Sequence, residues 1–128
     1  GNAMSAIDRD TITRYLASCD LVHGKGTPDH ACTIASIHLA MGHPLTDERD
    51  ECMSPVVHAW TIRVQDRMPV EMMAVGDEHG DRWRAAAPFI AGSASSGPSD
   101  EERRVILLDW MWDRLSDGWA SLVVQLYT

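Results

Sequence analysis

The sequence has few of the residues that usually mark a specialised site. It contains three cysteines, Cys19, Cys32 and Cys52, in 128 residues. An odd count without short spacing argues against a disulfide framework and against a Cys-x-x-Cys metal motif. Reduced cysteines, and the absence of a signal peptide after Met4, predict a cytoplasmic protein.

Long apolar runs and an excess of basic charge are also missing. No apolar run approaches the ~18 residues that a membrane span needs, so we expect no membrane partner. Eleven basic residues against nineteen acidic ones give a net charge of −8. Such a surface repels phosphate, so we expect no nucleic-acid partner. An acidic mimic of nucleic acid would need its carboxylates on one face, but the sequence scatters them.

Catalytic motifs are absent as well. There is no Gly-x-Ser-x-Gly elbow and no His-Glu-x-x-His pair. The stretch Gly24–Thr27 lacks both the upstream glycine and the Gly-Lys-Ser/Thr order of a phosphate-binding loop. The sequence therefore predicts no catalytic residue, no cofactor and no bound metal, and favours a protein that is not an enzyme.

What the chain does contain fits one globular domain. Hydrophobic residues make up 45% and charged residues 23% of the sequence, close to globular averages. Gly1-Asn2-Ala3 before Met4 is typical of a tag remnant. We therefore predict a tag remnant over residues 1–4 and a single helical domain over 5–128.

Apolar residues at helical spacing predict the first two helices. Asp8 is a good N-cap for a helix that continues to Val22. A second helix is expected over Asp29–Met41, with Gly42 just beyond its end. This second helix is apolar nearly all round, which is typical of a central, buried helix.

Thr46 is expected to cap a third helix. Ser54-Pro55 is expected to restart or kink it, because serine is a good cap and proline suits the first helical turn. Val56–Val64 is rich in β-branched residues and is also compatible with a strand. We prefer the helix because the apolar stripe continues for three turns. Asp81 is expected to cap a short fourth helix.

The last helix has the clearest start, since Ser99–Glu102 fits a capping box. Ser116-Asp117-Gly118 is expected to interrupt it, and Trp119–Thr128 forms either a second helix or an extended tail. Together these segments predict an all-α fold: a compact bundle of about five helices in a single domain.

Two groups of residues are candidates for function. His38, Cys52 and His58, with Asp66 as a partner, would form a polar pocket between helices if the fold brings them together. Cys32 would become nucleophilic only beside a histidine such as His38 or His58.

The second group is an interface. Trp110, Met111 and Trp112 are consecutive, so one helix cannot bury all three against one neighbour. Exposed tryptophan and methionine are enriched in interface cores. The lead hypothesis is therefore a non-enzymatic module that binds a protein partner or itself, as a regulatory or accessory factor. The alternative is a small enzyme or metal-binding protein that uses His38, Cys52 and His58.

The segments Glu51–Trp60 and Val64–Pro69, with Leu108–Trp112, resemble parts of small uncharacterised bacterial all-helical proteins. The resemblance covers about the last two-thirds of the chain. It implies a helical fold and no particular activity.

Overall fold

The computed structural model describes residues 8–127. It contains α1 (Arg9–Ala17), α2 (Thr33–Ala40), α3 (Pro55–Arg67), η2 (Val70–Met73), α4 (Glu78–Ala86), η3 (Ala87–Ile90) and α5 (Asp100–Tyr127). Between residues 8 and 127 there is no strand, only an isolated bridge between Gly26 and Ala31. The all-α prediction is confirmed.

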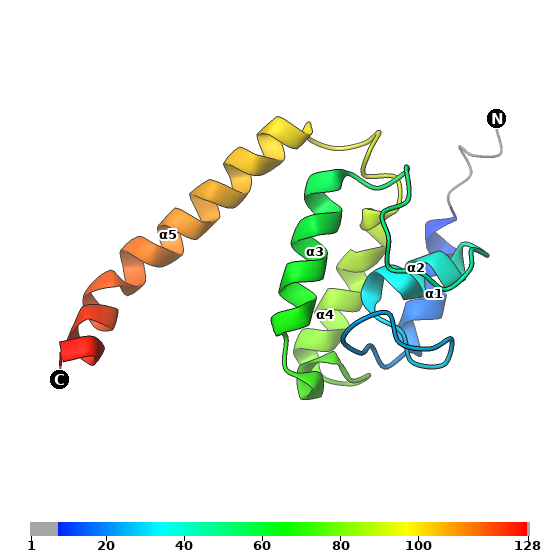
Figure 1. Cartoon of the computed structure of the whole chain (residues 1–128), viewed down its shortest axis with the longest axis horizontal. Helices are drawn as coiled ribbons and strands as arrows, with labels where there is room; N and C mark the ends of the chain where they lie inside the picture. The colour runs from blue at the N-terminus through cyan, green and yellow to red at the C-terminus, as the bar shows by residue number, and fades with distance from the viewer. Residues whose placement is uncertain (1–7, 128) are drawn as a thin grey trace. The chain divides into compact units, whose positions relative to one another are not determined.

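The chain divides into two compact units, one ending at Ser96 and the other beginning at Gly97. The first unit contains every helix from α1 to η3, and the second contains α5 (Figure 1). The domain boundaries expected from the sequence, 1–4 and 5–128, stay predictions.

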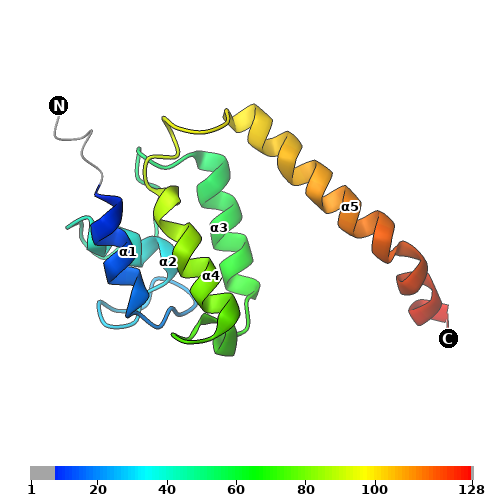
Figure 2. The same cartoon turned by 180° about the vertical axis from the view of Figure 1, so that it is seen from behind.

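The core of the first unit is organised around α2. Every residue of α2 from Thr33 to His38 is buried. Helix α2 packs against both α1 and α3, and α4 packs against α1, as both views show (Figures 1 and 2). The expectation of a central, buried second helix is confirmed.

Four predicted helix boundaries in the first unit are wrong. Helix α1 ends at Ala17 rather than Val22, because the Val22 N–H bonds to the Ala31 carbonyl. This pairing also delays the second helix, which begins at Thr33 with Cys32 as its N-cap.

Helix α4 begins before Asp81. Its N-cap is Asp77, whose carboxylate accepts hydrogen bonds from the backbone N–H groups of His79 and Gly80. These bonds satisfy two of the free donors of the first turn, so the helix already includes Glu78, His79 and Gly80.

Helix α3 confirms the Ser54-Pro55 start, whereas the start expected at Thr46 is the fourth wrong boundary, because residues 46–54 are not helical. The Ser54 hydroxyl accepts from the Val57 N–H, and Val56–Val64 is helical rather than extended. The strand alternative is therefore wrong.

Helix α5 begins with the predicted capping box but ends later than expected. Ser99 Oγ accepts from the Glu102 N–H at 3.1 Å, and the Glu102 carboxylate accepts from the Ser99 N–H at 3.2 Å. The helix continues through Ser116–Gly118 to Tyr127. The predicted interruption is wrong, because a glycine inside a helix costs only about 1 kcal/mol.

Arg84 is a buried cation that ties three segments together. Only 4% of its side chain is exposed. Its guanidinium donates to the carbonyls of Cys19 at 2.8 Å and Ala74 at 3.1 Å, and also to the carbonyl of Met73. It therefore satisfies three backbone carbonyls at the ends of α1 and η2 or just beyond them.

We expect Arg84→Ala to lower the free energy of unfolding by about 3 kcal/mol, because carbonyls hydrogen-bonded to a buried cation would lose their donor. Denaturant unfolding measures this change. Arg82→Ala is the matched control: Arg82 is 75% exposed and pairs only with Glu78, so its loss should cost less than about 1 kcal/mol. Equal losses from the two variants would contradict a structural role for Arg84.

Candidate functional site

The strongest polar cluster lies at the C-terminal end of α2. His38 is near the end of the helix, and Gly42, with a φ of +81°, turns the chain just after it. The His43 N–H donates to the His38 carbonyl at 2.8 Å, and the Gly42 N–H donates to the Leu39 carbonyl at 3.0 Å. This pair of bonds is a Schellman motif. It places His43 beside His38 across the turn.

The two imidazoles and one carboxylate converge in this cluster. Nδ1 of His38 lies 3.0 Å from Nδ1 of His43, and the ring centroids are 5.3 Å apart. Nδ1 of His43 lies 3.7 Å from Oδ1 of Asp50. His38 is buried, whereas His43 and Asp50 are partly exposed, so the cluster has one deep and one solvent-facing side.

Asp50 is held as a carboxylate by its neighbours. The pKa of Asp50 is lowered most by a hydrogen bond from the Cys52 side chain. The Cys52 backbone N–H and the two histidines lower it further, whereas burial of the carboxyl group raises it. The Cys52 N–H donates to Oδ2 at 3.0 Å. Burial, followed by the contact with Asp50, raises the pKa of Cys52.

The structure brings some of the predicted site residues together and leaves one apart. His38 and Cys52 both lie beside Asp50. His58, on α3, hydrogen-bonds through Nε2 to the Asp47 carbonyl at 3.0 Å, next to the Glu48 carbonyl that His38 Nε2 contacts at 2.8 Å. Asp66 is exposed near the end of α3 and is not part of the cluster.

Sequence reasoning missed His43 and Asp50. The sequence does contain a signal for His43. A glycine just past the end of a helix, here Gly42, reverses the chain and brings the next residue, His43, close to His38 in the last turn. Asp50 lies in an irregular loop, and no spacing rule predicts where such a loop returns.

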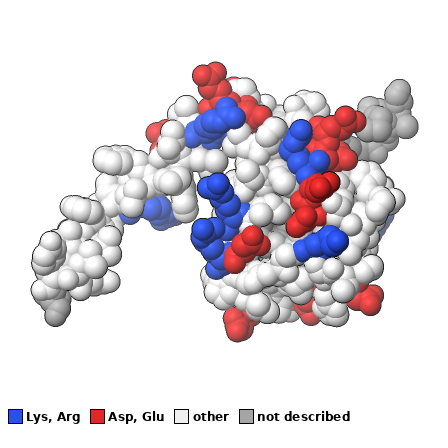
Figure 3. Space-filling view, in the orientation of Figure 1, with Lys and Arg blue, Asp and Glu red and all other residues white. Residues whose placement is uncertain are grey.

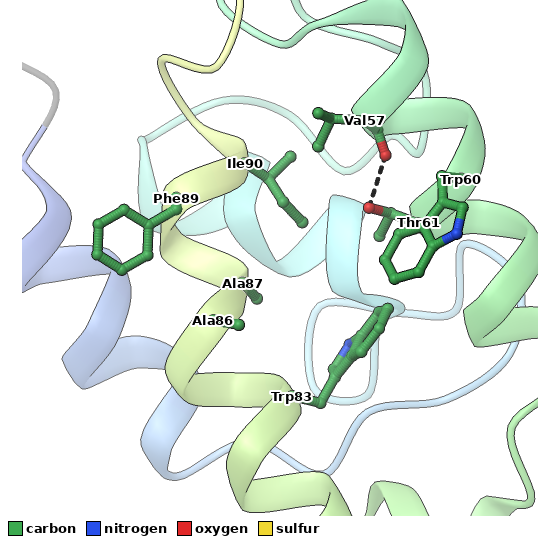
Figure 4. A pocket seen from close by; sticks show the side chains of 8 residues that line it. All are labelled: Val57, Trp60, Thr61, Trp83, Ala86, Ala87, Phe89 and Ile90. Atoms are coloured by element: carbon green, nitrogen blue, oxygen red, sulfur yellow. Dashed lines mark hydrogen bonds between the residues drawn. The ribbon is translucent and has the colours of Figure 1, made fainter. Parts of the chain in front are cut away.

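A second feature of the first unit is an apolar pocket between α3 and the α4–η3 segment. It has a volume of about 210 Å³ and is lined by Val57, Trp60, Thr61, Trp83, Ala86, Ala87, Phe89 and Ile90. Trp60 and Trp83 face one another with ring centroids 6.2 Å apart (Figure 4). The only hydroxyl, on Thr61, donates to the Val57 carbonyl (Figure 4). No ionisable side chain lines the pocket.

Helix α5 carries the most exposed apolar side chains. Seven of them alternate at spacings of three and four residues: Val105, Leu108, Trp112, Leu115, Trp119, Leu122 and Leu126. Their exposed fractions run from 44% at Leu122 to 71% at Leu126. We call this set the heptad stripe, because the spacing is that of the a and d positions of a coiled coil.

The predicted interface residues divide between the sides of α5. Trp112 is on the heptad stripe, and Met111 flanks it. Trp110 falls at the f position, on the far side of the helix, where the Arg114 guanidinium lies 5.0 Å from its ring centroid. All three residues are exposed.

Surface charge does not single out another site. On the face drawn in Figure 3, lysine and arginine side chains lie among aspartates and glutamates rather than in one patch. Among the described residues, no helix combines the length and apolar character needed to cross a lipid bilayer.

Comparison with known proteins gives no family. No family model matches the chain, and no match is found among curated proteins or among solved structures. The resemblance to small bacterial helical proteins therefore stays a prediction.

The cysteines provide a test of the nucleophile hypothesis. Cys32 is fully buried, its sulfur accepts from the Ala35 N–H at 3.4 Å, and burial is the main effect that raises its pKa. We expect Cys32 to react with a thiol reagent at pH 7.5 only after unfolding, whereas the partly exposed Cys19 and Cys52 react earlier. Counting reactive thiols by absorbance, with Cys32→Ser as the control, measures this. Rapid labelling of native Cys32 would instead indicate an activated thiolate.

Proposed function

We propose that this chain is a protein-interaction module that forms a homodimer by pairing α5 with α5 of a second copy. The observation that carries the proposal is the heptad stripe. Seven consecutive a and d positions are apolar and exposed. Such a repeat keeps one seam facing a partner helix over the whole length of both helices.

The stripe has a hole of the kind that coiled-coil packing requires. A cavity of about 480 Å³ on α5 is lined by Trp112, Leu115, Ser116 and Trp119. These residues stand at positions i, i+3, i+4 and i+7, which surround one knob from a facing helix. Since the knobs and the holes belong to the same stripe, a second copy of α5 is complementary to the first.

The area of the stripe is sufficient for a stable dimer. Trp112 and Trp119 are 69% and 63% exposed. Because a buried tryptophan covers roughly 200 Å², the four tryptophans of a dimer contribute roughly 500 Å². The ten aliphatic side chains add a similar amount or more. The total approaches the ~1,200–2,000 Å² of stable interfaces.

Charges beside the stripe suit a parallel pair. Arg104 occupies the g position of one heptad and Asp109 the e position of the next, five residues along the chain. In a parallel, in-register dimer Arg104 faces the partner's Asp109, and opposite charges at these positions favour that orientation. Leucine at all three d positions is also compatible with two strands.

The alternative, a small enzyme with an inter-helix pocket, has less support. Asp66 is exposed on α3, away from His38 and Cys52, and the apolar pocket has no ionisable lining. We therefore do not propose a reaction.

Sedimentation equilibrium of the full chain tests the proposal. We expect a species of twice the 14.2 kDa chain mass. Trp112→Asp should raise the dissociation constant at least about a hundredfold, because losing a buried tryptophan costs about 3–5 kcal/mol and each 1.4 kcal/mol is tenfold.

Trp110→Asp is the matched control, since it changes the same residue type in the same turn but off the heptad stripe. Its dissociation constant should stay within about threefold of the unmodified chain. Circular dichroism confirms that both variants remain helical. A monomeric unmodified chain, or equal weakening by the two substitutions, would overturn the proposal.

A further inference from the structure

We propose that His38, His43 and Asp50 bind a divalent transition-metal ion of the zinc class. Their ligand atoms all lie within 4.8 Å of one another, and they are the one group of three such ligands among the residues that the structure describes. The site lies in the first unit and is independent of the pairing of α5.

Two of the three ligand-to-ligand distances are close to those around a tetrahedral ion, and the third is at most 4.8 Å. Zinc binds imidazole nitrogen and carboxylate oxygen at roughly 2.0–2.2 Å, so neighbouring ligand atoms lie about 3.4 Å apart. The two Nδ1 atoms are 3.0 Å apart, and His43 Nδ1 is 3.7 Å from Asp50 Oδ1. These two distances bracket the required value. Three protein ligands leave one position for water.

The tautomer of His38 is set for metal binding. Its Nε2 lies 2.8 Å from the Glu48 carbonyl, and a carbonyl oxygen can only accept, so Nε2 carries the proton. In the neutral ring the Nδ1 lone pair then points toward His43. Histidines that bind metals use this arrangement, in which the second ring N–H donates to a carbonyl or carboxylate.

Asp50 is oriented by a comparable outer contact. Its Oδ2 accepts the Cys52 N–H at 3.0 Å, which leaves Oδ1 on the side of His43. Two imidazoles with one carboxylate form a donor set suited to Zn²⁺ and related first-row ions rather than to Mg²⁺ or Ca²⁺, which prefer all-oxygen sites.

Binding is a ligand exchange without oxidation or reduction. With His38 Nδ1 accepting, the 3.0 Å contact requires a proton on His43 Nδ1. The ion takes the place of that proton. In a neutral His43 ring the proton moves to Nε2, and in an imidazolium ring, which already carries a proton on Nε2, it is released to solvent. Because only neutral imidazoles bind the ion, affinity should fall as the pH is lowered.

Calorimetric titration of the full chain, stripped with chelator, with Zn²⁺ alone at pH 7.5 tests the site. We expect one ion per chain. His43→Ala should weaken binding by at least about a hundredfold, the upper end of what the loss of an outer contact costs. Co²⁺ should give the visible absorption of a tetrahedral site, and that band should be lost in His43→Ala. Asp50→Asn, which can still accept the Cys52 N–H, should also weaken binding.

The matched control is His79→Ala. His79 Nδ1 lies 3.6 Å from the Asp77 carboxylate, so it is a histidine–aspartate pair without a third ligand. This variant should bind Zn²⁺ like the unmodified chain. Circular dichroism checks that each variant is folded. Absence of stoichiometric binding, or equal affinity in the unmodified chain and in folded His43→Ala, would overturn the proposal.

Discussion

A helix that is apolar on every side must be buried on every side, and the first unit is organised by this constraint. Burial of α2 removes water from its ends, where backbone groups have no partner within the helix. Side chains replace the water at the N-terminal end. Cys32 caps the first turn, and Gln65 of α3 accepts the Thr33 N–H. Trp83 of α4 donates to the Thr33 hydroxyl at 2.8 Å, so this end of α2 is tied by hydrogen bonds to both α3 and α4.

At the other end of α2, the free backbone carbonyls accept hydrogen bonds from the turn that follows. The same turn brings the histidines of the cluster together. Gly42 allows the chain to reverse direction, and the reversal places the imidazole of His43 beside that of His38. The loop that follows is then held by two histidines from different helices, because His38 and His58 contact the carbonyls of Glu48 and Asp47. The proposed metal ligands are therefore positioned by hydrogen bonds that also hold the fold.

Short sequence motifs correctly predicted the helix starts whose free backbone N–H groups are capped by residues close in the sequence. Ser54-Pro55 and the Ser99–Glu102 capping box are complete within four residues, and both helix starts were correct. The start of α2 was not, because the pairing of Val22 with Ala31 competes with helix formation and involves residues nine apart. Likewise, His38 was recognised as a candidate but Asp50 was not, since its position depends on the path of an irregular loop.

Gly118 gives α5 a weak point about two-thirds of the way from Asp100 to Tyr127. An isolated helix in water is only marginally stable, and a glycine inside it lowers that stability further. A copy of the chain without a partner would open locally at this point more often than a paired copy. Proteases cleave such opened segments. Pairing through α5 would therefore also set the lifetime of the chain, since unpaired copies would be trimmed first.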